Sequence, residues 1–248
     1  MGPAADGPIV RIRPLAERAV VVLPTYNEVD NLRPMVGEIL ARGLEVLVVD
    51  DGSPDGTGDL AEQLRRECDG LVDVLHRTGK QGLGTAYVAG FKHALARDFQ
   101  LIFEMDCDFS HDPAYLPRFL ARIQDADLVL GSRYVRGGGT VNWALPRRVI
   151  SRGGSLYSQI ILGLPYRDLT GGFKCYRRRV LEALDLDSVR SNGYAFQIEL
   201  TNRAHRKRFK IVELPIVFQE RREGASKMSK DIVIEAAWKV WLFRLGLA

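Results

Sequence analysis

The chain has 248 residues, of which 46% are hydrophobic and 27% are charged, and its formal net charge is only +4. This apolar content is enough for the core of one or two α/β domains and argues against a disordered chain. The small basic excess suits anionic small molecules or an anionic membrane surface, and we expect no nucleic-acid partner. Cys68, Cys107 and Cys175 are far apart, so we expect a reducing compartment and neither a disulfide framework nor a structural zinc site.

Residues 1–18 lack the apolar core of a signal peptide, and we expect a flexible N-terminal segment there. Apolar runs and helical patterns then alternate. Strands are predicted at 18–24, 45–51, 71–77, 100–108 and 126–133, and helices at 31–43, 57–68, 84–98 and 112–124. This alternation predicts an α/β fold with a mostly parallel central sheet that is flanked by helices.

The alternation weakens after Arg133. The pattern predicts a Gly-rich loop at 136–143, helices at 146–163 and 194–208, and strands at 172–178 and 210–221. Because no linker is evident, we expect one domain over 19–229, followed by an amphipathic C-terminal helix at 230–248. No stretch is apolar enough for a membrane span, so we expect a soluble or peripheral protein.

Three stretches carry acidic residues where a predicted strand ends. In "VLPTYNEVDNL", Pro24 is expected to end the strand, and the polar residues are either a helix cap from Thr25 or Asn27 or part of a ligand site. In "VVDDGSPDGT", the adjacent Asp50 and Asp51 repel each other, so at least one needs a donor partner. This stretch is either a turn with a helix cap at Asp55 or Thr57 or a nucleotide contact.

The third stretch is "FEMDCDFSHDP". Asp106 and Asp108 are two residues apart, so in an extended chain their side chains point the same way. Paired carboxylates suit Mg²⁺ or Mn²⁺ together with ligand phosphates, and Ser110 could complete the edge. The alternative is that both aspartates simply cap turns. His111 is expected to stabilise the loop rather than bind a hard metal ion.

Basic and Gly-rich segments suggest contacts with anions. "GKQGLGTAY" opens a predicted helix, which is either an anion site or only a tight connection. Cationic side chains lie in loops or at strand ends, where sites are commonly built, and several of them imply a ligand with several phosphates. They are Arg133, Arg147, Arg148, Arg152, Lys174, Arg221, Arg222 and Lys227.

The C-terminal helix presents a polar stripe at Asp231, Glu235 and Lys239 on an otherwise apolar surface. The helix either packs on the core or lies at a membrane surface with Trp238 and Trp241 at headgroup level.

Eight motifs occur in the order found in dolichol-phosphate mannose synthases: LPTYNE, VVDDGSPDGT, GKQGLGTAY, MDCDFSHDP, GSRY, DLTGGFKCYRR, YAFQIEL and ERREGASK. The chain resembles this family of inverting family 2 glycosyltransferases over residues 19–229. The resemblance implies a GT-A nucleotide-diphospho-sugar transferase fold. It implies transfer of mannose from GDP-mannose to a polyprenyl (dolichyl-type) monophosphate, giving a β-linked product and GDP.

The resemblance also implies residue roles. The guanosine part would be held by Pro24, Tyr26, Glu28, Val49 and Asp51. The DxD edge would be Asp106, Cys107 and Asp108, with Asp106, Asp108 and Ser110 as the metal set. The catalytic residues would be Asp106, Asp108 and Arg133, and the donor diphosphate or sugar would contact Arg133, Arg221 and Lys227. The acceptor phosphate would contact Ser151, Arg152 and Lys174. Cys107 stands where the family usually has Ala, and we expect little effect because that position mainly offers its backbone.

A phosphate acceptor needs no general base, because its second pKa is about 6 and its oxygen is already anionic at neutral pH. Other readings are a related transferase that uses UDP-glucose or another nucleotide sugar, a nucleotidyltransferase and a non-enzymatic binding module. We expect a protein that is peripheral on the cytoplasmic face of a membrane, with a possible membrane-anchoring protein partner or domain.

Overall fold

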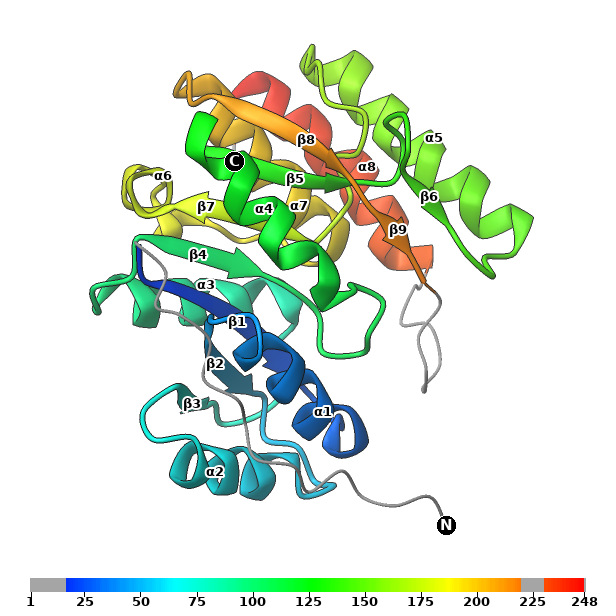
Figure 1. Cartoon of the computed structure of the whole chain (residues 1–248). Helices are drawn as coiled ribbons and strands as arrows, with labels where there is room; N and C mark the ends of the chain where they lie inside the picture. Colours follow the sequence, from blue (N-terminus) through cyan, green and yellow to red (C-terminus); the bar gives the residue numbers. More distant parts are fainter. Residues whose placement is uncertain (1–16, 220–229, 248) are drawn as a thin grey trace.

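The computed structural model describes residues 17–219 and 230–247, and its centre is a seven-stranded sheet with the order β3-β2-β1-β4-β7-β5-β8 (Figure 1). The strands are β1 (Ala19–Thr25), β2 (Glu45–Asp50), β3 (Val72–His76), β4 (Leu101–Glu104), β5 (Leu128–Ser132), β7 (Lys174–Arg177) and β8 (Ile211–Pro215). All neighbouring pairs are parallel except those that involve β7, which runs antiparallel to β4 and β5. The predicted mostly parallel sheet is therefore confirmed.

Helices cover both faces of this sheet because the strands alternate buried apolar residues between them. Val21 and Leu23 of β1 face a core shared with α1 (Val29–Leu40), α2 (Thr57–Glu67) and α4 (Leu116–Arg122). Val20 and Val22 face a second core, which is shared with α3 (Leu83–Leu95), α6 (Arg178–Ala183) and α7 (Gly193–Arg206). In Figure 1, α1 and α4 lie in front of the sheet, and α3 and α7 lie behind it. The arrangement leaves the carboxyl ends of the strands open for a site.

The first strand does not stop at its proline. Pro24 lies inside β1 and pairs with Val49 of β2, so the prediction that Pro24 ends the strand is wrong. Neither Thr25 nor Asn27 caps α1. The loop after β2 supplies the missing acceptors instead: Ser53 Oγ accepts from the N–H of Asn27, Thr57 Oγ1 from Glu28 and an Asp55 carboxylate oxygen from Val29. These three hydrogen bonds connect the segment after β1 to the segment after β2.

Several elements are shorter or more numerous than the pattern suggests. The predicted helix at 112–124 is α4 flanked by the 3₁₀ turns η1 (Pro113–Tyr115) and η2 (Ile123–Asp125). The Gly-rich loop contains β6 (Gly139–Thr140), which pairs with β9 (Val217–Phe218) in a separate two-stranded sheet. The short helix α6 and the 3₁₀ turn η3 (Leu186–Ser188) were not predicted, because each has too few residues to show a helical repeat.

The C-terminal helix α8 (Lys230–Leu245) packs on the core and also exposes aromatic residues. Val240 and Phe243 are buried in the second core, whereas Trp238 and Trp241 are exposed. It contacts α7 and α5 (Leu145–Leu162), and Trp241 donates a 2.9 Å hydrogen bond from Nε1 to the hydroxyl of Tyr157 on α5. Within the described residues, no helix combines the length and apolar character needed to cross a membrane.

Candidate active site

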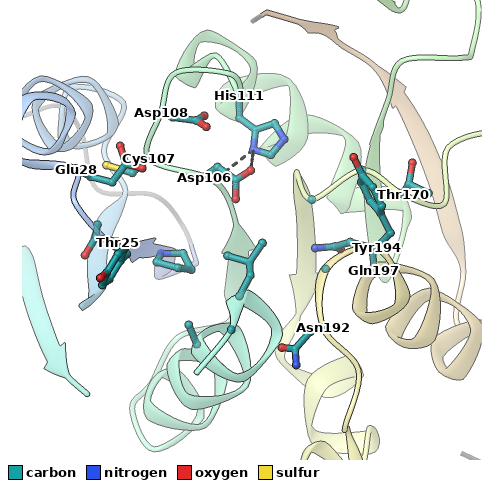
Figure 2. Close-up of a pocket in the computed structure, with 18 of the residues that line it drawn as sticks. Thr25, Glu28, Asp106, Cys107, Asp108, His111, Thr170, Asn192, Tyr194 and Gln197 are labelled. Atoms are coloured by element: carbon teal, nitrogen blue, oxygen red, sulfur yellow. Dashed lines mark hydrogen bonds and ion pairs between the residues drawn. The ribbon is translucent and has the colours of Figure 1, made fainter. Parts of the chain in front are cut away.

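A cavity of about 440 Å³ lies at the carboxyl ends of β1, β2 and β4, a size typical of small-molecule sites (Figure 2). These strands are neighbours in the sheet, which brings the three acidic stretches of the sequence to one edge. Eight of the predicted site residues line this cavity: Pro24, Tyr26, Glu28, Asp51, Asp106, Cys107, Asp108 and Arg133. The sequence therefore located the acidic part of the cavity wall.

The adjacent Asp50 and Asp51 have different partners. Asp50 accepts from Thr25 Oγ1 at 3.1 Å and from Ser53, so it joins two loops behind the cavity. Asp51 faces the cavity and pairs with Arg77 at 2.5 Å. Burial raises the pKa of Asp51, and the neighbouring Arg77 opposes that rise. The expected donor partner for this carboxylate pair is thus Arg77, from the end of β3.

The two aspartates of the DxD stretch follow β4 in a folded loop. Asp106 accepts from the hydroxyl of Tyr87 at 3.0 Å, and its backbone N–H donates to Nδ1 of His111 at 3.1 Å. Asp108 Oδ1 accepts from the backbone N–H of Ser110 at 3.0 Å, across Phe109, whose φ is 59°. The His111 ring stacks on Phe173 and meets Phe218 edge-on. His111 therefore fixes the loop, as expected.

The oxygen atoms of this loop fit a divalent metal ion. Asp106 and Asp108 both line the cavity, and the neighbouring Ser110 Oγ is buried without a hydrogen-bond partner. In the described part of the chain, no cluster of three or more His, Cys, Asp or Glu residues could hold a metal ion by itself. One or two carboxylates completed by ligand phosphates is the usual arrangement for Mg²⁺.

Arg133 lines the opposite part of the cavity and is already paired. Its Nε and one terminal nitrogen donate to Asp168 at 2.7 Å each, and that nitrogen also donates to Thr170 at 2.9 Å. Its guanidinium group lies 5.4 Å from the centre of the Trp143 ring. Burial lowers the pKa of Arg133, but the Asp168 carboxylate outweighs this effect and the pKa lies above its usual value. Arg133 is therefore a permanently charged and rigidly held part of the wall.

Five predicted residues do not line the cavity. Val49 of β2 is in the core against α3, and Ser110 is buried within the DxD loop, where its backbone N–H donates to Asp108. Ser151 accepts from the hydroxyl of Tyr134, and Arg152 is exposed on α5. Lys174 is 1% exposed and donates to the backbone oxygen of Gln197 and to Thr201, so its predicted contact with the acceptor phosphate is wrong. Arg221 and Lys227 lie outside the described residues.

The cavity also has lining residues that the sequence did not single out as site residues. They include Lys80, Trp143, Asn192, Tyr194 and Gln197, and the cavity is also lined by Arg147, which the sequence named only among its loop cations. Lys80 lies 4.5 Å from the centre of the Tyr26 ring, and Arg147 lies 4.1 Å from that of Trp143. Arg147 and Gln197 stand in motifs that the sequence highlighted, but only the packing of α5 and α7 shows that they reach the cavity.

A buried polar network lies beneath this wall. Glu104 of β4 accepts from Tyr176 at 3.1 Å and from the side-chain amide of Gln197, and Lys174 stands opposite Glu104 in the β4–β7 register. Burial raises the pKa of Glu104 to about 7, although Lys174 opposes the rise. Burial likewise lowers the pKa of Lys174 to about 8. Through Glu104, this network holds the side-chain amide of Gln197 from the core side of the cavity wall.

Two curated relatives match almost the whole chain. The undecaprenyl-phosphate mannosyltransferase of Micrococcus luteus is 50% identical over 233 residues, which is 93% of this chain and 95% of that protein. The polyprenol monophosphomannose synthase of Mycolicibacterium smegmatis is 48% identical over 232 residues, covering 92% of this chain and 87% of that protein.

Solved structures show the same fold at low sequence identity. Glucosyl-3-phosphoglycerate synthase from Mycobacterium tuberculosis, in complex with Mn²⁺, UDP-glucose and phosphoglyceric acid, has a TM-score of 0.65 and 18% identity, covering 94% of this chain and 81% of that chain. The family model described as glycosyl transferase family 2 matches residues 20–185. With this match and two relatives near 50% identity, the chain belongs to glycosyltransferase family 2.

Proposed function

We propose that this protein transfers mannose from GDP-mannose to the phosphate of a polyprenyl monophosphate, with inversion and release of GDP. The observation that carries this proposal is the layout of one continuous cavity. Acidic and aromatic residues form one end, the DxD carboxylates lie in the middle, and Arg133 and Arg147 lie at the other end beside α5. The names of the two curated relatives support mannose as the sugar and a polyprenyl phosphate as the acceptor.

The donor nucleotide fits the end formed by β1 and β2. Tyr26 offers a ring face, and Glu28 and Asp51 offer carboxylate oxygens, which can accept from the N–H groups of guanine or from the ribose hydroxyls. Lys80, beside Tyr26, adds a positive charge on the path toward the diphosphate. Asp106, Asp108 and Ser110 would hold a Mg²⁺ or Mn²⁺ ion, which supplies neutralisation of the diphosphate charge when it is bound.

The acceptor phosphate fits the opposite end. The guanidinium groups of Arg133 and Arg147 lie 5.4 Å and 4.1 Å from the centre of the Trp143 ring, and together they can hold an anionic headgroup. A phosphate oxygen forms the new bond to the anomeric carbon while the bond to GDP breaks, and the electron pair leaves on the GDP phosphate. No proton moves, so the residues orient two anions and need supply no base. Attack opposite to GDP gives the β-linked product.

An exposed apolar surface on α5 and α8 supports contact with a membrane. Its exposed members are Leu145, Val149, Ile150, Leu156, Ile160, Trp238, Trp241 and Leu245. Arg148 and Arg152 are exposed on the same helix α5, and its first turn leads into the cavity through Arg147. Apolar and basic groups together favour an anionic bilayer. We therefore place the protein peripherally on the cytoplasmic face, with a membrane-anchoring protein partner or domain as a further possibility to be tested.

The test is incubation of the purified protein with labelled GDP-mannose, Mg²⁺ or Mn²⁺ and a polyprenyl monophosphate in detergent or liposomes. We expect a labelled, organic-phase product that depends on all three additions, and GDP should inhibit its formation more strongly than UDP. Labelled product from UDP-glucose but not from GDP-mannose would show that the donor assignment is wrong. Release of free mannose without lipid product would overturn the acceptor assignment.

A further inference from the structure

Two amide side chains in the cavity wall have oxygen atoms without a partner. Gln197 and Asn192 both line the cavity, and Gln197 is only 3% exposed. Within the described residues, Oε1 of Gln197 and Oδ1 of Asn192 are among the few buried side-chain atoms that make no hydrogen bond. A buried carbonyl oxygen without a donor is costly, so such atoms need a structural explanation.

Hydrogen bonds to buried neighbours fix the orientation of the Gln197 side-chain amide. Its Nε2 donates to Glu104, and Glu104 also accepts from the hydroxyl of Tyr176. The backbone oxygen of Gln197 is held by Lys174 at 2.9 Å. In this orientation Nε2 of the amide is used by the Glu104 carboxyl group, so only Oε1 is left to accept from another group. The network therefore keeps Oε1 as the acceptor that remains for another group.

A glycine packs directly against each of the two amides. A Cβ atom at Gly172 would lie 3.2 Å from Nε2 of Gln197, and one at Gly82 would lie 2.7 Å from Oδ1 of Asn192. Both glycines line the cavity, and Gly82 has a φ of 102°, which side chains rarely adopt. A side chain at either position would push against the amide, so the two glycines allow Gln197 and Asn192 to lie where they do in the cavity wall.

Gln197 lies in the cavity wall between two parts of the site. In the view of Figure 2 it stands between Asp106 of the DxD loop and Thr170, whose hydroxyl accepts a hydrogen bond from Arg133. A nucleotide sugar with its base near Tyr26 and its diphosphate near the DxD loop would place its sugar between the diphosphate and the acceptor phosphate. Hydroxyl groups are the donors that the sugar can offer there, and the two unpartnered atoms are acceptors.

We propose that Oε1 of Gln197 and Oδ1 of Asn192 accept hydrogen bonds from hydroxyl groups of the transferred sugar and so select its configuration. This inference rests on the proposed function only in placing a nucleotide sugar in the cavity. A site built to pair with a hydroxyl group discriminates strongly against a sugar that lacks it, because the buried acceptor then stays unpaired. An epimer that carries the hydroxyl on the other face of the ring fails for the same reason.

The test compares Gln197→Met with the wild type, using calorimetric binding of GDP and GDP-mannose in Mn²⁺ and kcat/KM for mono-deoxy analogues of GDP-mannose. We expect GDP affinity to stay within about twofold and kcat/KM for GDP-mannose to fall by about tenfold or more. One analogue, which lacks the hydroxyl that Gln197 binds, should be used equally by both proteins. Equal losses for GDP and GDP-mannose, or one uniform loss across every analogue, would overturn the proposal.

Three further variants guard against a purely structural effect. Asn192→Asp keeps an oxygen at the same place and should retain discrimination, whereas Asn192→Ala should lose it for a different hydroxyl. Gln124→Met, at an exposed glutamine of η2, should match the wild type in every measurement. If the wild type binds UDP-glucose instead of GDP-mannose, the proposed donor fails. The Gln197 comparison is then made between UDP and UDP-glucose, where a selective loss for the sugar nucleotide still supports the inference and an equal loss refutes it.

Discussion

The carboxylate of Asp168 holds the guanidinium group of Arg133 through two 2.7 Å hydrogen bonds, and both side chains are buried. Removal of one partner leaves the other charge buried without compensation. We therefore expect Asp168→Ala to lower the free energy of unfolding by about 3–5 kcal/mol. Urea denaturation measures this change. Glu38→Ala, which removes the exposed partner of Arg42, is the control and should cost less than about 1 kcal/mol. Equal effects of the two substitutions would contradict the role of the buried pair.

Asp108→Asn tests the metal assignment with little change in shape. The amide oxygen can still accept from the N–H of Ser110, so we expect the melting temperature to stay close to that of the wild type. The lost charge should weaken Mn²⁺ binding in the presence of GDP and reduce transfer by about 100-fold or more. Paramagnetic resonance of free Mn²⁺ and initial rates give the two quantities. Wild-type rates in this variant, or full wild-type activity in chelator, would show that the DxD loop does not bind a catalytic metal ion.

The buried pair of Glu104 and Lys174 should make stability depend on pH. The pKa of Glu104 is raised from 4.5 to about 7, so the folded state binds more protons than the unfolded state in this range. Its contribution to stability is complete below about pH 4.5 and is lost as the pH rises through 7. The pKa of Lys174 is lowered from 10.5 to about 8, so its contribution is present above about pH 10.5 and is lost as the pH falls through 8.

It follows that Glu104 and Lys174 contribute least to the stability of the fold between about pH 7 and 8, where both groups are charged. The double variant Glu104→Gln/Lys174→Met should therefore gain stability relative to the wild type as the pH rises from 5 to 7, by up to about 3 kcal/mol. Urea denaturation of both proteins at the two pH values checks this expectation. A constant difference between them would show that the pKa of Glu104 is not raised in the folded protein.

The exposed surface of α5 can be tested by adding a charge. Ile160 is 72% exposed, and Ile160→Asp should reduce binding to anionic liposomes several-fold without unfolding the protein. Ala121→Asp adds the same charge to an exposed site on α4, across the sheet, and should not change sedimentation with liposomes. Such point variants are more informative than removal of α8, because that helix also buries Phe243 in the core. Unchanged liposome binding in Ile160→Asp would assign the apolar surface to a protein contact instead.

The positions of the acidic strand ends were predictable because a parallel sheet gathers the carboxyl ends of its strands at one edge. Asp51, Asp106 and Asp108 follow strands that the hydrophobic pattern identifies with ease, and the local motifs then indicate a nucleotide and a metal ion. The groups that cap α1 were harder to predict from the sequence. The N–H groups before α1 bind to Ser53, Thr57 and Asp55, which lie more than twenty residues away in the sequence.

By itself, the sequence determined the α/β fold, the three acidic strand ends and the resemblance to a sugar-transferring family, because these depend on local periodicity and on residues that stand together in the chain. Only the tertiary structure decided which cations and amides reach the cavity. Lys174 turns into the core, whereas Arg147 and Gln197 reach the cavity. Arg133 is held in the wall by a hydrogen-bonded ion pair with Asp168, 35 residues away. Side-chain direction and burial at these positions follow from how α5, α7 and β7 pack against the sheet, and local sequence does not encode that packing.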